Sequence, residues 1–396
     1  MTQISERIHY VGVNDHGKEL FEGLWPMPQG ISYNSYLVVD EKVALIDTVE
    51  VGFEEEFLSN IQEALESAQG SRLERQIDYL VVNHMEPDHS SLVRSVMEKY
   101  PLMQVLASAK AVPMLRGYYG VPEERITVMS EGSSVSLGDC CLRFYMTPMI
   151  HWPETMMTWL QEEGTLFSGD AFGTFKAVDR NPIDKEWTFD EYRKEMIRYY
   201  SNIVGKYGTP VQSALKKLRN LEIKRICSTH GPVWETAIPQ VIDLYDRLSR
   251  YETERGVCIV YGSMYGNTAA AAEALARELD IRRIPYAIHN LTPTGLTLSA
   301  ALRDAFIYNT IVVGSPTYNN GIFPPVEAFM KALQGRLVRE RRFFAFGSFT
   351  WSGASVNLLN QMAENMGYEI LGQGLSFPQA YAREKCDMSA VADLLG

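Results

Sequence analysis

From residue 256 onward, short apolar segments of the chain alternate strictly with helical ones. The segment NTAAAAEALARELD, residues 267–280, is rich in alanine and predicts a helix. Four segments predict strands: VCIVYGS (257–263), PYAIHNL (285–291), NTIVVGS (309–315) and RRFFAFGS (341–348). Strand, helix and strand in this order indicate a parallel sheet that helices cover on both faces.

The first 250 residues follow a different pattern, in which short strands alternate with helices less regularly. Residues 32–40 and 42–49 predict a hairpin, residues 53–69 an amphipathic helix, and residues 77–84 a buried strand. Further strands are expected at 104–109, 141–148, 155–161, 164–170 and 224–230. Because the polar stretch DRLSRYETERG separates the two patterns, we expect two domains, residues 1–250 and 254–396.

Composition narrows the class of protein. Lys and Arg number 37 against 49 Asp and Glu, and this net charge of −12 disfavours nucleic acid and anionic membranes as partners. The N-terminus lacks an apolar signal region, and no run of about 18 apolar residues occurs, so we expect a cytoplasmic protein. The five cysteines form no C-x-x-C pair, which argues against a disulfide framework, a zinc ribbon or a built-in rubredoxin module.

The stretch VVNHMEPDHS, residues 81–90, places four metal-binding side chains directly after the apolar run of the predicted strand 77–84. If strand geometry continues, His84, Glu86 and Asp88 point to one side, while His89 points elsewhere and suits a second metal. Pro87 argues against a helix interior. The cluster therefore predicts a ligand-bearing loop at the end of a buried strand.

Three more candidate ligands, His151, Asp170 and His230, follow or end other predicted strands. A lone histidine is a weak indication of a metal, and we expect His9, His16 and His289 to be surface or packing residues. Seven candidates at strand ends together predict a metal centre.

The spacing His84-x-Glu86-x-Asp88-His89, followed by the three later residues, resembles the dinuclear site of the metallo-β-lactamase fold. Asp47 also matches a supporting position of that fold. In the hydrolase branch the position of Glu86 is normally a histidine. A carboxylate there favours iron or manganese over zinc, and this is similar to the non-heme di-iron site of the flavodiiron proteins.

The resemblance implies a ligand set and leaves two neighbouring residues open. One iron would bind His84, Glu86 and His151, the other Asp88, His89 and His230, with Asp170 bridging; His84 is the ligand that varies within the family. Glu154 is interpreted as a surface acid or as a supporting acid near the metals. Tyr199 or Tyr200 resembles a tyrosine close to the metals of that family, although a packing role is equally compatible with the sequence.

Three loops after predicted strands of the C-terminal part indicate a flavin site. Small and hydroxylated residues in YGSMYGNT (261–268) can surround a phosphate at a helix N-terminus. Tyr318 in GSPTYNNG (314–321) and Trp351 in FGSFTWSG (346–353) can lie against a planar ring, although Trp351 could instead fill the core. The loops resemble the phosphate loop and the two ring loops of flavodoxin, which implies FMN. The expected contacts are Ser263, Met264, Tyr265, Gly266, Asn267, Thr268, Pro316, Thr317, Tyr318, Asn319, Ser348, Phe349, Thr350, Trp351, Ser352 and Gly353.

The resemblance thus covers nearly the whole chain and implies an α/β protein. We expect an N-terminal metallo-β-lactamase-like αββα sandwich, followed by a C-terminal flavodoxin-like doubly wound parallel sheet. The implied function is reduction of O2 to water, of NO to N2O, or of both. The alternatives are a dinuclear zinc hydrolase with an accessory flavodoxin domain and a non-enzymatic flavin electron carrier.

The family also implies partners. An external donor would supply electrons: a rubredoxin, a flavoprotein reductase or a reduced deazaflavin. A head-to-tail homodimer, possibly paired into a dimer of dimers, would bring the FMN of one subunit to the irons of the other.

Overall fold

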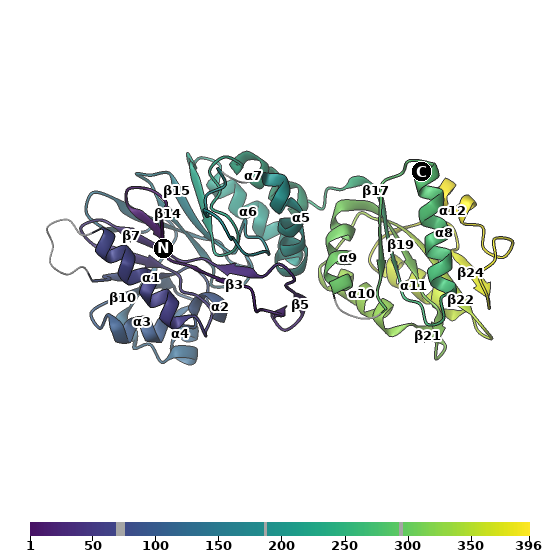
Figure 1. Ribbon diagram of the computed structural model, residues 1–396, viewed down its shortest axis with the longest axis horizontal. Helices are drawn as coiled ribbons and strands as arrows, with labels where there is room; N and C mark the ends of the chain where they lie inside the picture. The colour runs from purple at the N-terminus through teal and green to yellow at the C-terminus, as the bar shows by residue number, and fades with distance from the viewer. Residues whose placement is uncertain (69–75, 186–187, 293–295) are drawn as a thin grey trace. The chain divides into compact units, whose positions relative to one another are not determined.

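The computed structural model describes residues 1–68, 76–185, 188–292 and 296–396 (Figure 1). The described chain forms two compact units. The first contains Met1–Phe21, Met27–Tyr199 and Thr209–Asp246, and the second contains Glu22–Pro26, Tyr200–Gly208 and Arg247–Gly396.

Two sheets form the centre of the first unit. The first sheet has the order β1-β2-β7-β8-β9-β10-β11, and β8, β9, β10 and β11 run parallel. Its strands are Thr2–Gln3, Ile8–Tyr10, Tyr36–Val39, Val43–Ile46, Tyr79–Val82, Gln104–Ser108 and Ile126–Met129. The second sheet has the order β12-β13-β14-β15-β16, and only its last pair is parallel. Its strands are Ser134–Ser136, Cys141–Met146, Met156–Leu160, Thr165–Gly169 and Arg225–Ser228.

Helices flank the two sheets of this unit. In Figure 1, α1, α3 and α4 gather on one flank of the unit, and α5, α6 and α7 on the opposite flank. The helix α1 is amphipathic, because its buried residues Phe57, Ile61, Ala64 and Leu65 recur at helical spacing. The bounds are α1 Glu54–Ser67, α2 Pro87–Ser90, α3 Val93–Lys99, α4 Val112–Tyr119, α5 Phe189–Tyr199, α6 Gly208–Leu218 and α7 Ile238–Ser249. The last residue of the predicted helix 53–69 lies outside the described residues.

The apolar core of the first unit joins strands of both sheets. Alternate residues such as Ile8, Val38, Phe144 and Phe167 belong to one buried cluster, as expected when two sheets pack face to face. The minor elements of this unit are β3 Val13–Asp15, β4 Leu20–Phe21, β6 Ile31–Tyr33 and a 3-10 turn Glu123–Arg125. Three others belong to the second unit: β5 Trp25–Pro26, a π-helical turn Tyr200–Val204 and a 3-10 turn Gly205–Tyr207.

The second unit has one parallel sheet of order β18-β17-β19-β22-β23, with β24 also paired to β22. This is the doubly wound sheet expected from the alternation. Its strands are β17 Glu254–Tyr261, β18 Tyr286–Asn290, β19 Tyr308–Gly314, β22 Arg342–Phe349, β23 Glu369–Ile370 and β24 Leu375–Pro378. The ribbon β20 Thr317–Tyr318 and β21 Gly321–Ile322 lies beyond β19.

Helices cover both faces of this sheet. The helices α8 and α12 lie together on one face in Figure 1, and α9 and α10 on the other. The bounds are α8 Asn267–Ile281, α9 Leu296–Ile307, α10 Pro324–Gly335, α11 Ala354–Asn365 and α12 Met388–Leu395. Among the described residues, no helix is long and apolar enough to cross a membrane.

Candidate metal centre and flavin pocket

The loop after β9 carries four of the seven predicted ligands, but strand geometry ends at Val82. Glu86 precedes the helical turn α2, which begins at Pro87. Proline is well tolerated at a first helical position, so Pro87 lies outside a helix interior as expected, but residues 87–90 form a helical turn where a loop was predicted. The prediction that His84, Glu86 and Asp88 share one side was also wrong, because the turn carries Asp88 round to His89.

The first group of side chains contains His84, Glu86 and His151. The Nε2 of His151 lies 2.8 Å from Glu86 Oε2, and the Nε2 of His84 lies 3.4 Å from the same oxygen. The two imidazole Nε2 atoms are 3.4 Å apart. Three potential ligand atoms therefore face one point, which we call the first position.

The second group contains Asp88, His89 and His230. The Nε2 atoms of the two histidines are 3.0 Å apart, and they lie 3.1 Å and 3.3 Å from Asp88 Oδ2. These atoms define the second position. Both groups satisfy the distances needed to hold a metal ion.

Asp170 lies between the two positions and offers one oxygen to each. Its Oδ2 is 3.2 Å from His151 Nε2 and 3.6 Å from His84 Nε2, whereas its Oδ1 is 3.2 Å from His89 Nε2. Thr229 donates a hydrogen bond of 2.6 Å to Oδ1 and orients the carboxylate. The geometry suits a carboxylate that bridges two cations.

The donor set fits two metal ions. Both oxygens of Asp88, Oδ2 of Asp170 and Nδ1 of His89 are buried and have no hydrogen-bond partner among the described residues. Buried polar atoms are otherwise nearly always paired. Three carboxylates against four neutral imidazoles leave a net negative site that cations would neutralise, and this mixed set of nitrogen and carboxylate ligands suits iron.

The pKa values of the histidine and carboxylate ligands also indicate a site for cations. Burial alone would lower the pKa of both His89 and His151. The neighbouring Asp88 and Asp170 outweigh burial at His89 and raise its pKa to about 10. Asp170 and Glu86 do the same at His151 and raise its pKa to about 9. Burial raises the pKa of Asp170, but the neighbouring histidines hold it well below its usual range. Without a metal the site would bind protons, so metal binding should release them.

Several residues that support the metal ligands were not identified from the sequence. Asn34 donates to Ser228 O and Gly231 O at 2.9 and 2.8 Å, and Ser32 O accepts from His230 Nδ1 at 2.7 Å. These contacts span nearly 200 residues, so no local pattern could reveal them. Asp47, which the resemblance indicated, accepts from Asn83 N and Nδ2 at 2.7 and 3.0 Å and fixes the start of the ligand loop.

The structure also shows where Glu154 lies and which of Tyr199 and Tyr200 is close to the ligand groups, two questions that the sequence left open. Glu154 is 2% exposed and its Oε1 lies 2.8 Å from His84 Nδ1, so the surface interpretation was wrong. Tyr199 is fully buried with its ring 5.4 Å from that of His230, whereas Tyr200 packs against Phe306 in the second unit. Tyr199 is therefore the tyrosine beside the candidate metal centre.

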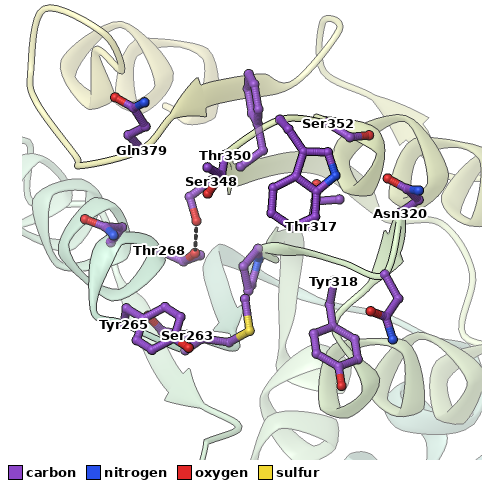
Figure 2. A pocket seen from close by; sticks show the side chains of 16 residues that line it. Ser263, Tyr265, Thr268, Thr317, Tyr318, Asn320, Ser348, Thr350, Ser352 and Gln379 are labelled. Carbon is purple, nitrogen blue, oxygen red and sulfur yellow. Dashed lines mark hydrogen bonds between the residues drawn. The ribbon is translucent and has the colours of Figure 1, made fainter.

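A cavity of about 340 Å³ opens at the carboxyl ends of β17, β19 and β22 (Figure 2). The strand order reverses between β17 and β19, and ligands of doubly wound sheets bind at such switch points. Ser263 Oγ accepts from Gly266 N and Ala269 N at 3.1 and 3.3 Å, and Thr268 Oγ1 lies 2.9 Å from Ser348 Oγ. Gly266 has φ 85°, which glycine adopts without strain and which turns the loop into α8.

The wall of this cavity contains most of the predicted contacts. Trp351 is 83% exposed, so the core-filling alternative was wrong, and Tyr318 is 41% exposed. Neither Gly266 nor Gly353 lines the cavity, although each directly precedes a helix, α8 or α11. Asn320 and Gln379 line it and were missed; Figure 2 shows Gln379 coming from the segment beyond β24.

Comparisons with known proteins agree with both units. Residues 31–231 match the ODP family beta lactamase, and residues 259–389 match flavodoxin. An anaerobic nitric oxide reductase flavorubredoxin of Vibrio vulnificus (strain YJ016) is 31% identical over 370 residues, which are 92% of this chain and 73% of that protein. The chain belongs to the flavodiiron protein family.

Solved structures extend the likeness to the whole fold. The rubredoxin oxygen:oxidoreductase of Desulfovibrio gigas superimposes with a TM-score of 0.91 at 27% identity, over 100% of this chain and 97% of that one. The flavodiiron protein of Giardia intestinalis superimposes with a TM-score of 0.92 at 27% identity, over 100% and 95%. The predicted fold class, a metallo-β-lactamase-like and a flavodoxin-like half, is thereby confirmed for this flavodiiron protein.

Proposed function

We propose that this flavodiiron protein is an oxidoreductase that reduces O2 to water, NO to N2O, or both. The observation that carries the proposal is the pair of ligand groups with Asp170 between them in one unit, together with the cavity at the three strand ends in the other. A hydrolase would need no flavin, and an electron carrier would need no dinuclear site.

The cofactors would be FMN and two non-heme irons. Reduced FMN supplies two electrons and two ferrous irons supply one each, which equals the four electrons that convert O2 and four protons into two waters. Two NO molecules need two electrons and two protons to give N2O and water.

We assign the metal-binding roles to the residues that the two groups contain. The first position is held by His84, Glu86 and His151, the second by Asp88, His89 and His230, and Asp170 bridges them. Direct ligation by His84 is supported by its Nε2, which faces Glu86, His151 and Asp170. These side chains are all buried, so they would hold the two ions away from bulk water.

For the FMN we propose contacts to the three loops at the carboxyl ends of β17, β19 and β22. Backbone amides around Ser263 and the N-terminus of α8 would take the phosphate. The exposed rings of Tyr318 and Trp351 would lie against the isoalloxazine. Asn320 and Gln379 would add hydrogen bonds at its edge.

The remaining proposals concern the setting of the enzyme. We propose domain limits of 1–250 and 254–396. We also propose a cytoplasmic location, with which the five free cysteines agree. Electrons would come from a separate donor: a rubredoxin, a flavoprotein reductase or a reduced deazaflavin.

A head-to-tail homodimer, possibly a dimer of dimers, would bring the FMN of one subunit to the irons of another. It follows from the family resemblance and from the need for short electron-transfer distances. Analytical ultracentrifugation that finds a fully active monomer would refute it.

In the central experiment, protein loaded with iron and FMN is reduced chemically under oxygen-free conditions. A measured amount of O2 or of NO is then added to parallel samples, and the consumption of each gas is followed. We expect turnover of at least one gas and about two irons per chain. Asp170→Ala should lose both the gas turnover and the iron. His16→Ala is the matched control, because His16 pairs with Asp179 on the surface and should leave activity unchanged. Two zincs per chain with steady hydrolysis would instead identify the hydrolase.

A further inference from the structure

The two metal positions differ in what stands behind their histidines. Behind the first position, His84 Nδ1 lies 2.8 Å from a carboxylate oxygen of Glu154. Behind the second, His230 Nδ1 lies 2.7 Å from the backbone carbonyl of Ser32. The Nδ1 of His89 has no hydrogen-bond partner among the described residues. One imidazole of the first position therefore has a carboxylate hydrogen-bonded to its Nδ1, whereas the described contacts place no carboxylate on the Nδ1 of His89 or His230.

Glu154 is held rigidly in this role. Its Oε1 also accepts from Met85 N at 3.0 Å, and its own carbonyl accepts from Ser108 Oγ at 2.6 Å. It is 2% exposed, and within the described chain no lysine or arginine pairs with it. Its charge is thus directed at His84 and is neither screened by water nor neutralised by a cationic side chain.

This contact determines how His84 can bind a metal. A carboxylate only accepts hydrogen bonds, so Nδ1 must carry the proton and Nε2 must present its lone pair. That lone pair faces Glu86 Oε2, Asp170 Oδ2 and His151 Nε2. A carboxylate behind an imidazole also makes the ring a stronger donor to its metal.

We propose that Glu154 is a positioning residue that makes the two metal positions unequal, and this rests on the di-iron function proposed above. It fixes His84 as a ligand of the first position and strengthens the hold of that position on its ion. The added negative charge also favours the higher oxidation state there. When ferricyanide removes one electron from the diferrous protein, the ferric ion lies in the first position.

Glu154→Gln tests the proposal, because glutamine keeps the size and an acceptor oxygen but removes the charge. In the iron-loaded protein, a potentiometric titration followed by electron paramagnetic resonance measures the potential at which the first electron leaves. We expect this potential to rise in Glu154→Gln and to stay near the wild-type value in Glu154→Asp, which keeps the charge. A purely structural role for the hydrogen bond predicts no shift in Glu154→Gln.

Iron retention against a chelator locates the effect. In a His230→Ala background, which weakens the second position, Glu154→Gln should lower the chelator concentration that removes the remaining iron by roughly 10- to 100-fold. In a His151→Ala background, which weakens the first position, the same substitution should change nothing.

Two results would overturn the inference: an unchanged potential in Glu154→Gln, or equal iron loss in both backgrounds. If the wild-type protein binds no iron at all, the proposed function fails. If it binds two irons and Glu154→Gln behaves as wild type, only this inference fails.

Discussion

Asn34→Ala should loosen the turn that carries His230 and weaken the second metal position. The Asn34 side chain is fully buried and makes three hydrogen bonds: it donates to Ser228 O and Gly231 O and accepts from Tyr10 Oη at 2.9 Å. At about 1 kcal/mol for each buried bond that is lost, the substitution should lower the free energy of unfolding by about 3 kcal/mol. Iron should be lost preferentially from the second position.

Hydrogen exchange and a double-mutant cycle can check this magnitude. Urea unfolding gives the stability, and amide exchange at Thr229 and Gly231 shows whether the loss is local. Tyr10→Phe removes only one of the three bonds and should cost about 1 kcal/mol. Since Asn34→Ala already breaks that bond, the double variant should be less destabilised than the sum by about the same amount.

The reasoning would be refuted by an Asn34→Ala protein with wild-type unfolding, wild-type exchange at the turn and two irons per chain. The turn would then be held by the remaining contacts, such as the 2.8 Å hydrogen bond from Gly231 N to Ser32 Oγ.

Three further outcomes are expected. Glu86→His, which removes a carboxylate from the first position, should shift the metal content from iron toward zinc and abolish gas reduction; a variant with two irons and full activity would contradict this. Trp351→Ala should weaken FMN binding by roughly 1 kcal/mol or more, measured by fluorescence titration of the apoprotein, because an exposed stacking ring is lost. His9 is buried with no partner for either ring nitrogen among the described residues, and burial lowers its pKa. As pH falls below about 6.5, the unfolded chain gains a proton that the folded chain resists. His9→Leu should therefore be less sensitive to acid than wild type between pH 7 and 5, and parallel stability curves would contradict this.

The sequence predicted most of the strands because their information is local. Apolar runs such as 77–84 and 257–263 became β9 and β17, since buried strands need continuous apolar residues. The grouping of the ligands could not be obtained from their spacing, although the family resemblance implied it. A spacing of two suggested that Asp88 would join His84, but the helical turn α2 turned it toward His89, and proline at position 87 fitted the first residue of that turn.

The supporting residues could not be predicted, because their partners are distant in sequence. Asn34 stood in a predicted strand, and nothing around it indicated contacts with Ser228 and Gly231. Gln379 follows β24 and reaches the flavin cavity only because that strand pairs with β22. In both cases the tertiary arrangement of strands, and no local pattern, brings the side chain to the site.

Both candidate sites lie at the carboxyl ends of parallel strands, but one is lined by buried ionisable groups and the other by uncharged polar groups. In the first unit, Asp170 and His230 follow the parallel pair β15 and β16, and ionisable groups are buried without enough partners. Only cations would complete that arrangement, so the energy of metal binding would also stabilise the fold. In the second unit the cavity wall contains no charged side chain, and hydroxyls, amides and a helix N-terminus are already hydrogen-bonded or open to solvent. Removal of FMN should therefore leave the second unit folded, whereas removal of metal should leave the first unit with buried carboxylates that only protonated histidines neutralise. Thermal unfolding of the iron-free and the FMN-free proteins would separate the two, with the larger loss of stability expected on removal of iron.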